Sequence, residues 1–337
     1  MATIPSQPLA QAPMSLGPTN SPTSRSLSAT FSDPAPYQFT QYYRNGPLVP
    51  DNAANSGIPT SGPIALSQFV GATSDPAAQS LSYTISANTQ NLDLLAYASS
   101  PSRPAPTRYV LGGAATVTYT ISPGIYVGSA TTAQNAIVTG ANDPTTGWQP
   151  TVTLTVINQG IVLGSGGDGG NGGISVPGQI AGPGDPGLSG GTAIVAQRAV
   201  TIQNVGTFAG GGGGGGGGNG AFSNPGPKQF VYYGGGGGGG GSGTNSAPNT
   251  GGVGGTGGPA DTAPGDPGQP GSFTAGGTGG ASPGANIGGP GGGRGQAGTA
   301  GSPLGAAGGA AGYYAKGNAN ITWQAVGTRQ GQVQPTV

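Results

Sequence analysis

The chain has 337 residues, of which 75 are glycine and 32 are proline, while only 5% are charged and the formal net charge is +0. This much glycine and proline is typical of low-complexity or disordered chains, but such chains normally stay soluble through a high net charge. The absence of Cys and His excludes disulfides and thiolate or imidazole metal sites. We therefore expect uncharged polar groups, or an ordered assembly that satisfies the backbone, to keep the chain soluble.

The charged residues and the apolar runs disfavour several classes of function. No basic patch is present, so we expect no nucleic-acid partner, and no apolar run approaches the ~18–20 residues that span a bilayer, so we expect no membrane insertion. Residues 1–7 lack the basic and apolar regions of a secretory signal. A protein acting outside the cell would then leave by another route, such as release of assembled virus particles.

The acidic residues indicate that the protein is not an enzyme. All nine are Asp and they are scattered singly, whereas a glycosidase needs two carboxylates that face each other. Asp168, in Gly-Gly-Asp-Gly-Gly-Asn-Gly-Gly, is faintly similar to calcium-binding glycine-rich repeats, but the repeat is not sustained. We predict no catalytic residue, no cofactor and no metal site.

Residues 1–79 are predicted to form an extended N-terminal arm and a docking segment. Residues 1–35 are rich in Pro, Ser, Thr and Ala without periodicity, which fits either a flexible arm or an arm that orders on a partner. A tyrosine-rich cluster and a turn at 44–47 follow, and then a short apolar element at 64–69 bracketed by Pro and Gly. The docking candidates are Tyr42, Tyr43, Ile64, Leu66 and Phe69.

Residues 80–150 carry the ordinary globular signal of the chain and are predicted to form a small β domain. Short runs of β-branched and aromatic residues alternate with Pro, Gly and Ser turns, as in Ser122-Pro123-Gly124. A short helical turn near 92–98 stays possible. The strands expected here and just beyond are 81–85, 116–121, 125–127 and 152–157.

Residues 151–337 form the predicted glycine-rich domain, and three of its segments align. Residues 154–160, 200–206 and 321–327 each read apolar-Thr-apolar and end at Gly four residues later, although so biased a composition also produces similarity by chance. We predict three equivalent strands, pinned at Thr155, Thr201 and Thr322, with the glycine tracts as excursions between them.

The glycine tracts can be ordered in two ways. Collagen needs Gly at every third position, a period that appears only briefly, as at 265–271, so collagen is disfavoured. The alternative is a bundle of polyglycine II helices, in which nine glycines would span ~28 Å. Each backbone hydrogen bond would contribute only ~1 kcal/mol, so the bundle must be large and cooperative. The expected fold is mainly β with little helix, combining an extended anchor, a small β domain and polyglycine II-type helices pinned by short strands.

Aromatic side chains return between the tracts, most densely at 219–233. An exposed loop tip carrying aromatics and a lysine suits sugars or an apolar patch on a protein; the alternative is that these rings are buried and cap the glycine bundle. Two residues further along the chain lie in weaker versions of the same setting. The receptor-binding candidates are Phe222, Lys228, Phe230, Tyr232, Tyr233, Phe273 and Arg294.

Two motifs carry a resemblance to a known family. Residues 312–331 resemble the end of the glycine-rich domains of tailed-bacteriophage tail proteins, which read Gly-Tyr…Gly-Asn…Ile-Thr-Trp…Gly-Thr-Arg-x-Gly. Residues 58–69 resemble an element near the start of phage tail fibre and tail tip proteins. The glycine tracts are similar to the polyglycine II domains of T-even-like phage adhesins, and the resemblance covers about half of the chain.

The resemblance implies a virion tail protein, extracellular when free. Its N-terminal region would mount on other tail or baseplate proteins, and its C-terminal domain would recognise a host surface protein or glycan. Many tail tips have three-fold symmetry, so a homotrimer or a single chain is expected. The alternatives are a purely structural tail-tip or baseplate protein, with the glycine-rich domain as spacer or plug, and a cellular wall protein, which would carry a signal sequence.

Overall fold

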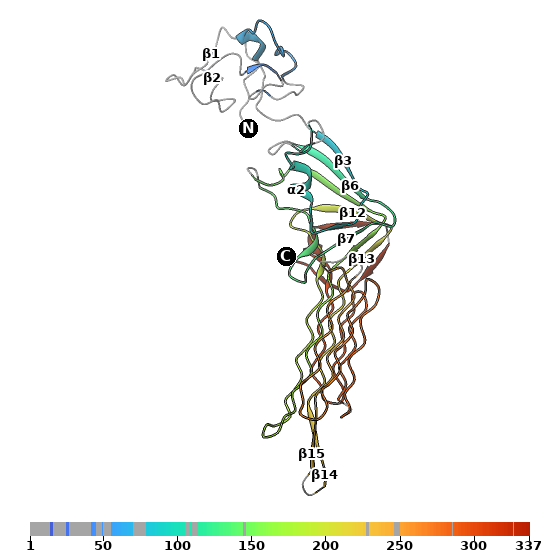
Figure 1. Ribbon diagram of the computed structural model, residues 1–337. Helices are drawn as coiled ribbons and strands as arrows, with labels where there is room; N and C mark the ends of the chain where they lie inside the picture. The colour runs from blue at the N-terminus through green and yellow to red at the C-terminus, as the bar shows by residue number, and fades with distance from the viewer. Residues whose placement is uncertain are drawn as a thin grey trace. The chain divides into compact units, whose positions relative to one another are not determined.

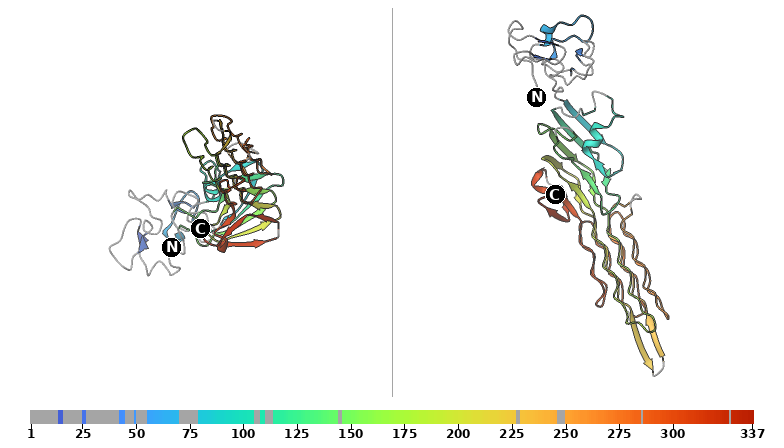
Figure 2. Two further views of the ribbon diagram at one scale, coloured as in Figure 1. Left: turned by 90° about the horizontal axis from the view of Figure 1, so that it is seen from below. Right: turned by 90° about the vertical axis from the view of Figure 1, so that its left-hand side faces the viewer.

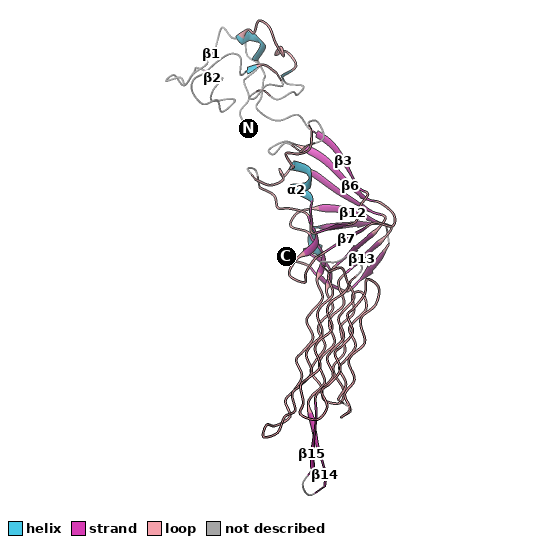
Figure 3. Ribbon diagram, in the orientation of Figure 1, coloured by secondary structure: helices cyan, strands magenta, loops and turns pink. Residues whose placement is uncertain are grey.

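The computed structural model describes residues 14–15, 25–26, 42–44, 49, 55–69, 79–104, 108–109, 114–143, 146–226, 229–245, 250–284, 286–325 and 327–337. The chain divides into two compact units. One comprises residues 1–81, 101–116 and 143–152, and the other comprises residues 82–100, 117–142 and 153–337. Strands far outnumber helices in the described residues, as predicted (Figure 3).

Three five-stranded sheets form the framework of the larger unit in the described part of the chain. Successive strands belong to the first, second and third sheet in turn, so the chain winds as a three-sided β-helix (Figures 1 and 2). The first sheet contains β3 (Gln79–Ile85), β6 (Ala115–Ile121), β9 (Thr153–Asn158), β12 (Val200–Asn204) and β17 (Ile321–Gln324). The second contains β4 (Thr89–Gln90), β7 (Tyr126–Gly128), β10 (Ile161–Leu163), β13 (Thr207–Ala209) and β18 (Thr328–Gln330). The third contains β5 (Leu92–Asp93), β8 (Asn135–Val138), β11 (Thr192–Val195), β16 (Tyr313–Lys316) and β19 (Gln332–Gln334).

The predicted repeat is confirmed by the strand register. Thr201 in β12 pairs with Thr155 in β9 on one side and with Thr322 in β17 on the other, in parallel strands. Side chains alternate between the faces of a strand, so Val200 and Ile202 are buried inside the β-helix. The predicted boundary between 80–150 and 151–337 lies inside the β-helix. Strands from both sides of residue 150 belong to the same three sheets.

Asparagines mark the corner between the first two sheets. Asn158 and Asn204 are buried, and Nδ2 of Asn158 donates to Oδ1 of Asn204 at 2.9 Å. Asn204 in turn donates to the carbonyl of Thr328 at 3.3 Å. A buried amide must be hydrogen-bonded to avoid a desolvation penalty. Here the side-chain amide of each Asn donates to an acceptor in the next coil.

One short helix lies against the first coils. In α2 (Leu94–Ser99), where a helical turn was possible from sequence, Oδ1 of Asp93 accepts the N–H of Ala96 at 3.0 Å and caps the N-terminus. Leu94 and Ala98 are its buried residues, and the Tyr119 hydroxyl donates to the Leu94 carbonyl. Later in the chain, η5 (Asn318–Asn320) connects β16 to β17.

The other unit contains two clusters of buried aromatic residues. Tyr109 and Trp148 lie with ring centroids 4.7 Å apart. Tyr42 and Phe69, at the end of η4 (Leu66–Phe69), meet edge to face at 6.1 Å. β1 (Met14–Ser15) and β2 (Arg25–Ser26) form a parallel pair.

Two long excursions leave the β-helix at the same corner, between the second and third sheets. Residues 164–191 lie between β10 and β11, and residues 210–312 lie between β13 and β16. In the first and last coils, single residues close this corner, namely Asn91 with φ 54° and Gly331 with φ 114°. Positive φ favours Asn and Gly, which explains these two residues at the tight corners.

Hydrogen bonds of residues 210–218 repeat every three residues. The N–H groups of Gly211 and Gly214 donate to segment 182–191, those of Gly212 and Gly215 to segment 236–242, and those of Gly213 and Gly216 to segment 296–299. A helix with three residues per turn presents successive N–H groups to three directions, as in polyglycine II geometry. The carbonyls accept N–H groups from three further segments, which are 167–173, 289–292 and 306–312.

Two segments therefore lie at the centre of a hexagonal array. Residues 210–218 have six hydrogen-bonded neighbours, and so do residues 234–243, which also bond to 210–218 itself. Counting the shared neighbours once, ten segments make up the array in the described residues. They run side by side away from the β-helix toward β14 (Ala221–Gly226) and β15 (Gln229–Tyr233) (Figure 2, right).

The spacing of glycines matches the place of each segment in the array. A Cβ added anywhere in 210–218 would overlap a backbone oxygen of a neighbour, so this central segment is all glycine. Segment 251–258 reads Gly-Gly-x because neighbouring segments cover two of its three faces. The third face is open, and there the segment carries a side chain at every third position, such as Val253. Segment 265–271 reads Gly-x-x because only one face is covered. The brief collagen-like period at 265–271 thus marks a segment at the rim of the array.

Candidate functional site

The turns between array segments gather at two ends. Five turns lie at the distal end, the one away from the β-helix, and we call them the distal loops: residues 174–181, 219–233, 260–262, 282–284 and 302–304. Hydrogen bonds of 2.7 Å join loops to each other, from Ser175 Oγ to the Ala221 carbonyl and from Asn219 Nδ2 to the Leu304 carbonyl. The N–H of Tyr232 donates to Thr262 Oγ1 at 3.2 Å, and Ser282 Oγ donates to the Gly234 carbonyl of the array at 2.7 Å. The distal loops therefore form one continuous end surface.

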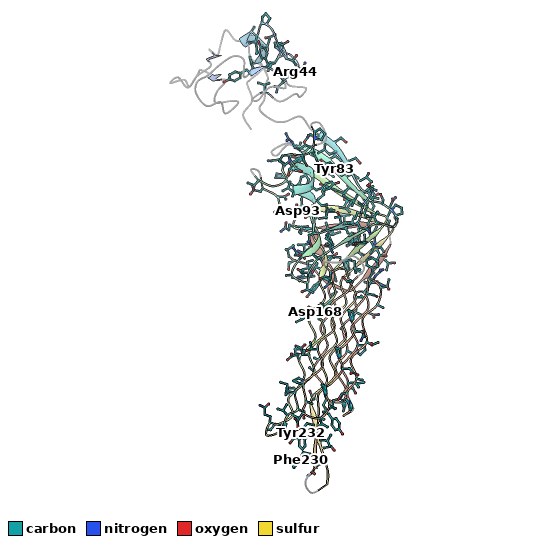
Figure 4. All side chains as sticks on the ribbon, in the orientation of Figure 1. Arg44, Tyr83, Asp93, Asp168, Phe230 and Tyr232 are labelled. Atoms are coloured by element: carbon teal, nitrogen blue, oxygen red, sulfur yellow. The ribbon has the colours of Figure 1, made fainter. Side chains whose placement is uncertain are left out.

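An antiparallel hairpin, β14–β15, projects beyond the other distal loops (Figure 1). Phe222 pairs directly with Tyr232, and the rings of Phe230 and Tyr232 lie 6.5 Å apart, so all three lie on one face. Phe222 is 59% exposed and Phe230 55% exposed. Figure 4 shows Phe230 and Tyr232 at the far end of the array from Asp93, with Asp168 between. Lys228 lies outside the described residues.

The neighbouring Tyr233 has a different role. It lies on the opposite hairpin face, bridges to Ala263, and packs so closely on Gly284 that an added Cβ there would lie 2.8 Å from its own Cβ. Tyr233 therefore anchors the hairpin to the array, while Phe222, Phe230 and Tyr232 form what we call the aromatic face.

Further exposed apolar residues surround this hairpin, and sequence reasoning missed them. Ile180 is 93% exposed and Leu304 is 92% exposed, on two other distal loops. Ile174 and Ile287 are each 45% exposed at the ends of their array segments. A Pro-Gly turn precedes Ile180 and a Ser-Pro pair precedes Leu304. These turn signals could have marked both residues as loop residues. Only the direction of each excursion shows that they meet at one end.

Phe273 and Arg294 lie at the opposite end of the array, in the turns next to the β-helix. Phe273 contacts the ring of Tyr126 in β7, with centroids 5.4 Å apart. Arg294 donates its Nε–H to the Phe273 carbonyl at 3.0 Å and stacks on the Phe273 ring at 4.4 Å. Burial lowers the pKa of the Arg294 guanidinium from its ordinary value. The structure thus separates these two receptor candidates from the aromatic face.

The docking candidates lie within the smaller unit. Tyr42 and Phe69 are fully buried against each other, so they support the segment and offer no surface of their own. Tyr43 is half-buried and donates its hydroxyl to the Gly62 carbonyl, and Ile64 is half-buried. The side chain of Leu66 lies outside the described residues.

The polar side chains of the array serve its backbone. Asp168 accepts the N–H of Val253 at 2.8 Å, and Asn171 accepts the N–H of Thr256 at 3.1 Å. Across the described ranges, no group of three or more acidic side chains is placed to hold a metal ion. None of the described helices is both long and apolar enough to cross a membrane.

Residues 80–334 match the family described as phage tail fibre adhesin Gp38, and the chain belongs to this family. A solved structure, the gp37-gp38 adhesin tip complex of the bacteriophage S16 long tail fiber, is similar at 22% identity and a TM-score of 0.49, covering 81% of this chain and 88% of that chain. No curated protein sequence matches. The protein is accordingly a component of the virion tail and an adhesin that recognises the host cell surface, as the resemblance implied.

Proposed function

We propose that the distal loops are the surface with which this adhesin binds its host receptor. The observation that carries the proposal is the concentration of large exposed apolar side chains at this one end, on separate loops that a rigid array holds together. Exposed apolar patches mark interaction sites, and aromatic anchors dominate binding energy at protein interfaces. An adhesin needs such a surface, which favours this reading over a purely structural spacer.

The rigid array supports this proposal energetically. Each central segment is hydrogen-bonded to six neighbours, so the loops are mounted on a framework that is ordered before binding. Preorganisation reduces the entropy lost on association. The distal loops carry one acidic residue, Asp261, which supports binding over a glycoside hydrolysis that would need two facing carboxylates.

Purified full-length protein is expected to bind host cells and to block adsorption of the phage in proportion to its concentration. Free protein competes for the same receptor, so phage remaining in the supernatant should rise with added protein. A non-adsorbing, phage-resistant host strain serves as the control and should not retain the protein. Failure to bind host cells would contradict the proposal.

We further propose that residues 1–79 attach the adhesin to other tail proteins, as one chain or as a homotrimer. Ile64 is half-buried and belongs to the apolar element at 64–69. Phe69 of this element is fully buried, as is Tyr42. Ile64→Asp is expected to lower the amount of adhesin on purified virions, measured by immunoblot, because a buried charge is costly at an interface. Binding of the purified variant to cells should stay unchanged. Normal incorporation would place the attachment elsewhere.

A further inference from the structure

A hollow of about 290 Å³ lies beside Arg294, at the end of the array next to the β-helix. It belongs to neither the aromatic face nor the distal loops. Segment 286–293 separates it from them by roughly 25 Å at the rise of such a helix. Its lining consists of Thr274, Gly293, Arg294, Gln296 and Gln330.

The guanidinium of Arg294 is held in place, but no described acidic side chain compensates its positive charge. Its Nε–H is used by the Phe273 carbonyl and one face of the group covers the Phe273 ring. Its two terminal nitrogens have no acceptor among the described residues, and no described acid pairs with it. Partial burial lowers the pKa of Arg294 through desolvation, a penalty that a bound anion would offset.

Neutral polar side chains complete the lining. The hydroxyl of Thr274 and the amides of Gln296 and Gln330 make no side-chain hydrogen bonds within the described ranges. A hydroxyl donates and accepts, and an amide offers both kinds of group. The hollow therefore presents one cationic fork and three uncharged groups suited to hydroxyls.

The backbone fixes these groups relative to one another. Gly295 has φ 63°, and its N–H donates to the Gly210 carbonyl at 2.8 Å. A Cβ at Gly295 would overlap the backbone of Gln330, so the Arg294 turn is pressed against β18. The carbonyl of Gln330 also accepts the N–H of Gly210 at 2.9 Å. The backbones of Arg294 and Gln330 are thus held next to each other before any ligand arrives.

We propose that this hollow binds one acidic monosaccharide unit of a bacterial surface polysaccharide, with the sugar carboxylate on Arg294 and its hydroxyls on Thr274, Gln296 and Gln330. A guanidinium pairs with a carboxylate through two parallel hydrogen bonds. The volume lies near the lower end, about 300 Å³, of small-molecule sites. A phosphate offers fewer hydroxyl donors to the amide oxygens than a sugar ring does, which favours the sugar. The proposal rests on the adhesin function but not on the distal loops as receptor surface.

The test is an NMR titration of the full-length protein with methyl β-glucuronide, following saturation transfer to the sugar. We expect saturable binding in the millimolar range that is roughly tenfold weaker in Arg294→Gln. Arg329→Gln is the matched control: Arg329 also stacks on an aromatic ring, that of Trp323 at 5.0 Å, but does not line the hollow. It should bind as the unmodified protein does.

Three comparisons can overturn the proposal. Methyl β-glucoside, which lacks the carboxylate, should not bind. Inorganic phosphate, measured by its displacement of the glucuronide, should bind more weakly than the glucuronide. Equal binding of phosphate would reduce the site to a plain anion site, and unchanged binding by Arg294→Gln would remove it. Thr274→Val keeps the contacts of Arg294 with Phe273 and should also weaken binding, which guards against a folding defect in Arg294→Gln. Cell binding through the distal loops should persist in every variant.

Discussion

Gly214→Ala is expected to disrupt the glycine array. Gly214 lies in a central segment, and an added Cβ would overlap the carbonyl oxygen of Asp168 in the neighbouring segment. Backbone cannot rotate away as a side chain can, so the segments must separate and lose hydrogen bonds on both sides, each contributing about 1 kcal/mol. Together with the overpacking cost of about 1–3 kcal/mol, we expect the free energy of unfolding to fall by roughly 3 kcal/mol or more, measured by denaturant titration.

Gly182→Ala is the matched control within the same array. Its added Cβ would come no closer than 3.7 Å to the Ile174 carbonyl oxygen, which is ordinary van der Waals contact. Removing glycine at such a position stabilises by about 0.4–1 kcal/mol through the unfolded state. If the two variants unfold at the same denaturant concentration, the hexagonal packing described for residues 210–218 is wrong.

Replacing Phe222 and Phe230 together by Ala is expected to abolish most host adsorption while virions still assemble. Both rings are more than half exposed, so their removal leaves no cavity in the protein. An aromatic anchor at the centre of an interface contributes about 2 kcal/mol or more, so a loss of at least roughly 30-fold in affinity is expected. Cell binding of the purified protein and the adsorption rate of the virion both measure it.

The control for this variant is an apolar truncation on the flank of the array. Leu188 is 54% exposed and Val253 is 65% exposed, and neither belongs to a distal loop. Leu188→Ala with Val253→Ala should leave adsorption unchanged. Equal losses in the two double variants would show that binding does not depend on the distal end.

The strands of the glycine-rich half could be predicted from the sequence because few large apolar residues occur there. Thr155, Thr201 and Thr322 occupy equivalent positions in successive coils of the β-helix. Matching short apolar patterns in the sequence was enough to align them. The order of segments within the array could not be predicted. Glycine has no side chain with which to specify a partner, and the choice of neighbour depends on the direction of every excursion.

Only those parts of the candidate site that are close together in the sequence could be predicted. Phe222 and Tyr232 occur together in sequence and face each other across a hairpin. Ile180 and Leu304 are far apart in sequence and join the same end only through their excursions. Phe273 and Arg294 resembled a loop tip because they also interrupt glycine tracts, but an interruption alone does not tell which end of the array it occupies.

The shared exit corner has a consequence for how such adhesins can change. Every excursion must return to the β-helix, so array segments are added in antiparallel pairs: residues 164–191 contribute one pair and residues 210–312 contribute four. Each pair brings one new distal loop and, for its own backbone, needs glycine only where it faces a neighbour. The coils beneath keep their register, as the single-residue corners at Asn91 and Gly331 show. Distal loops can therefore be lengthened or exchanged without any change to the part of the chain that folds around an apolar core, and under the proposed function such changes would alter host range.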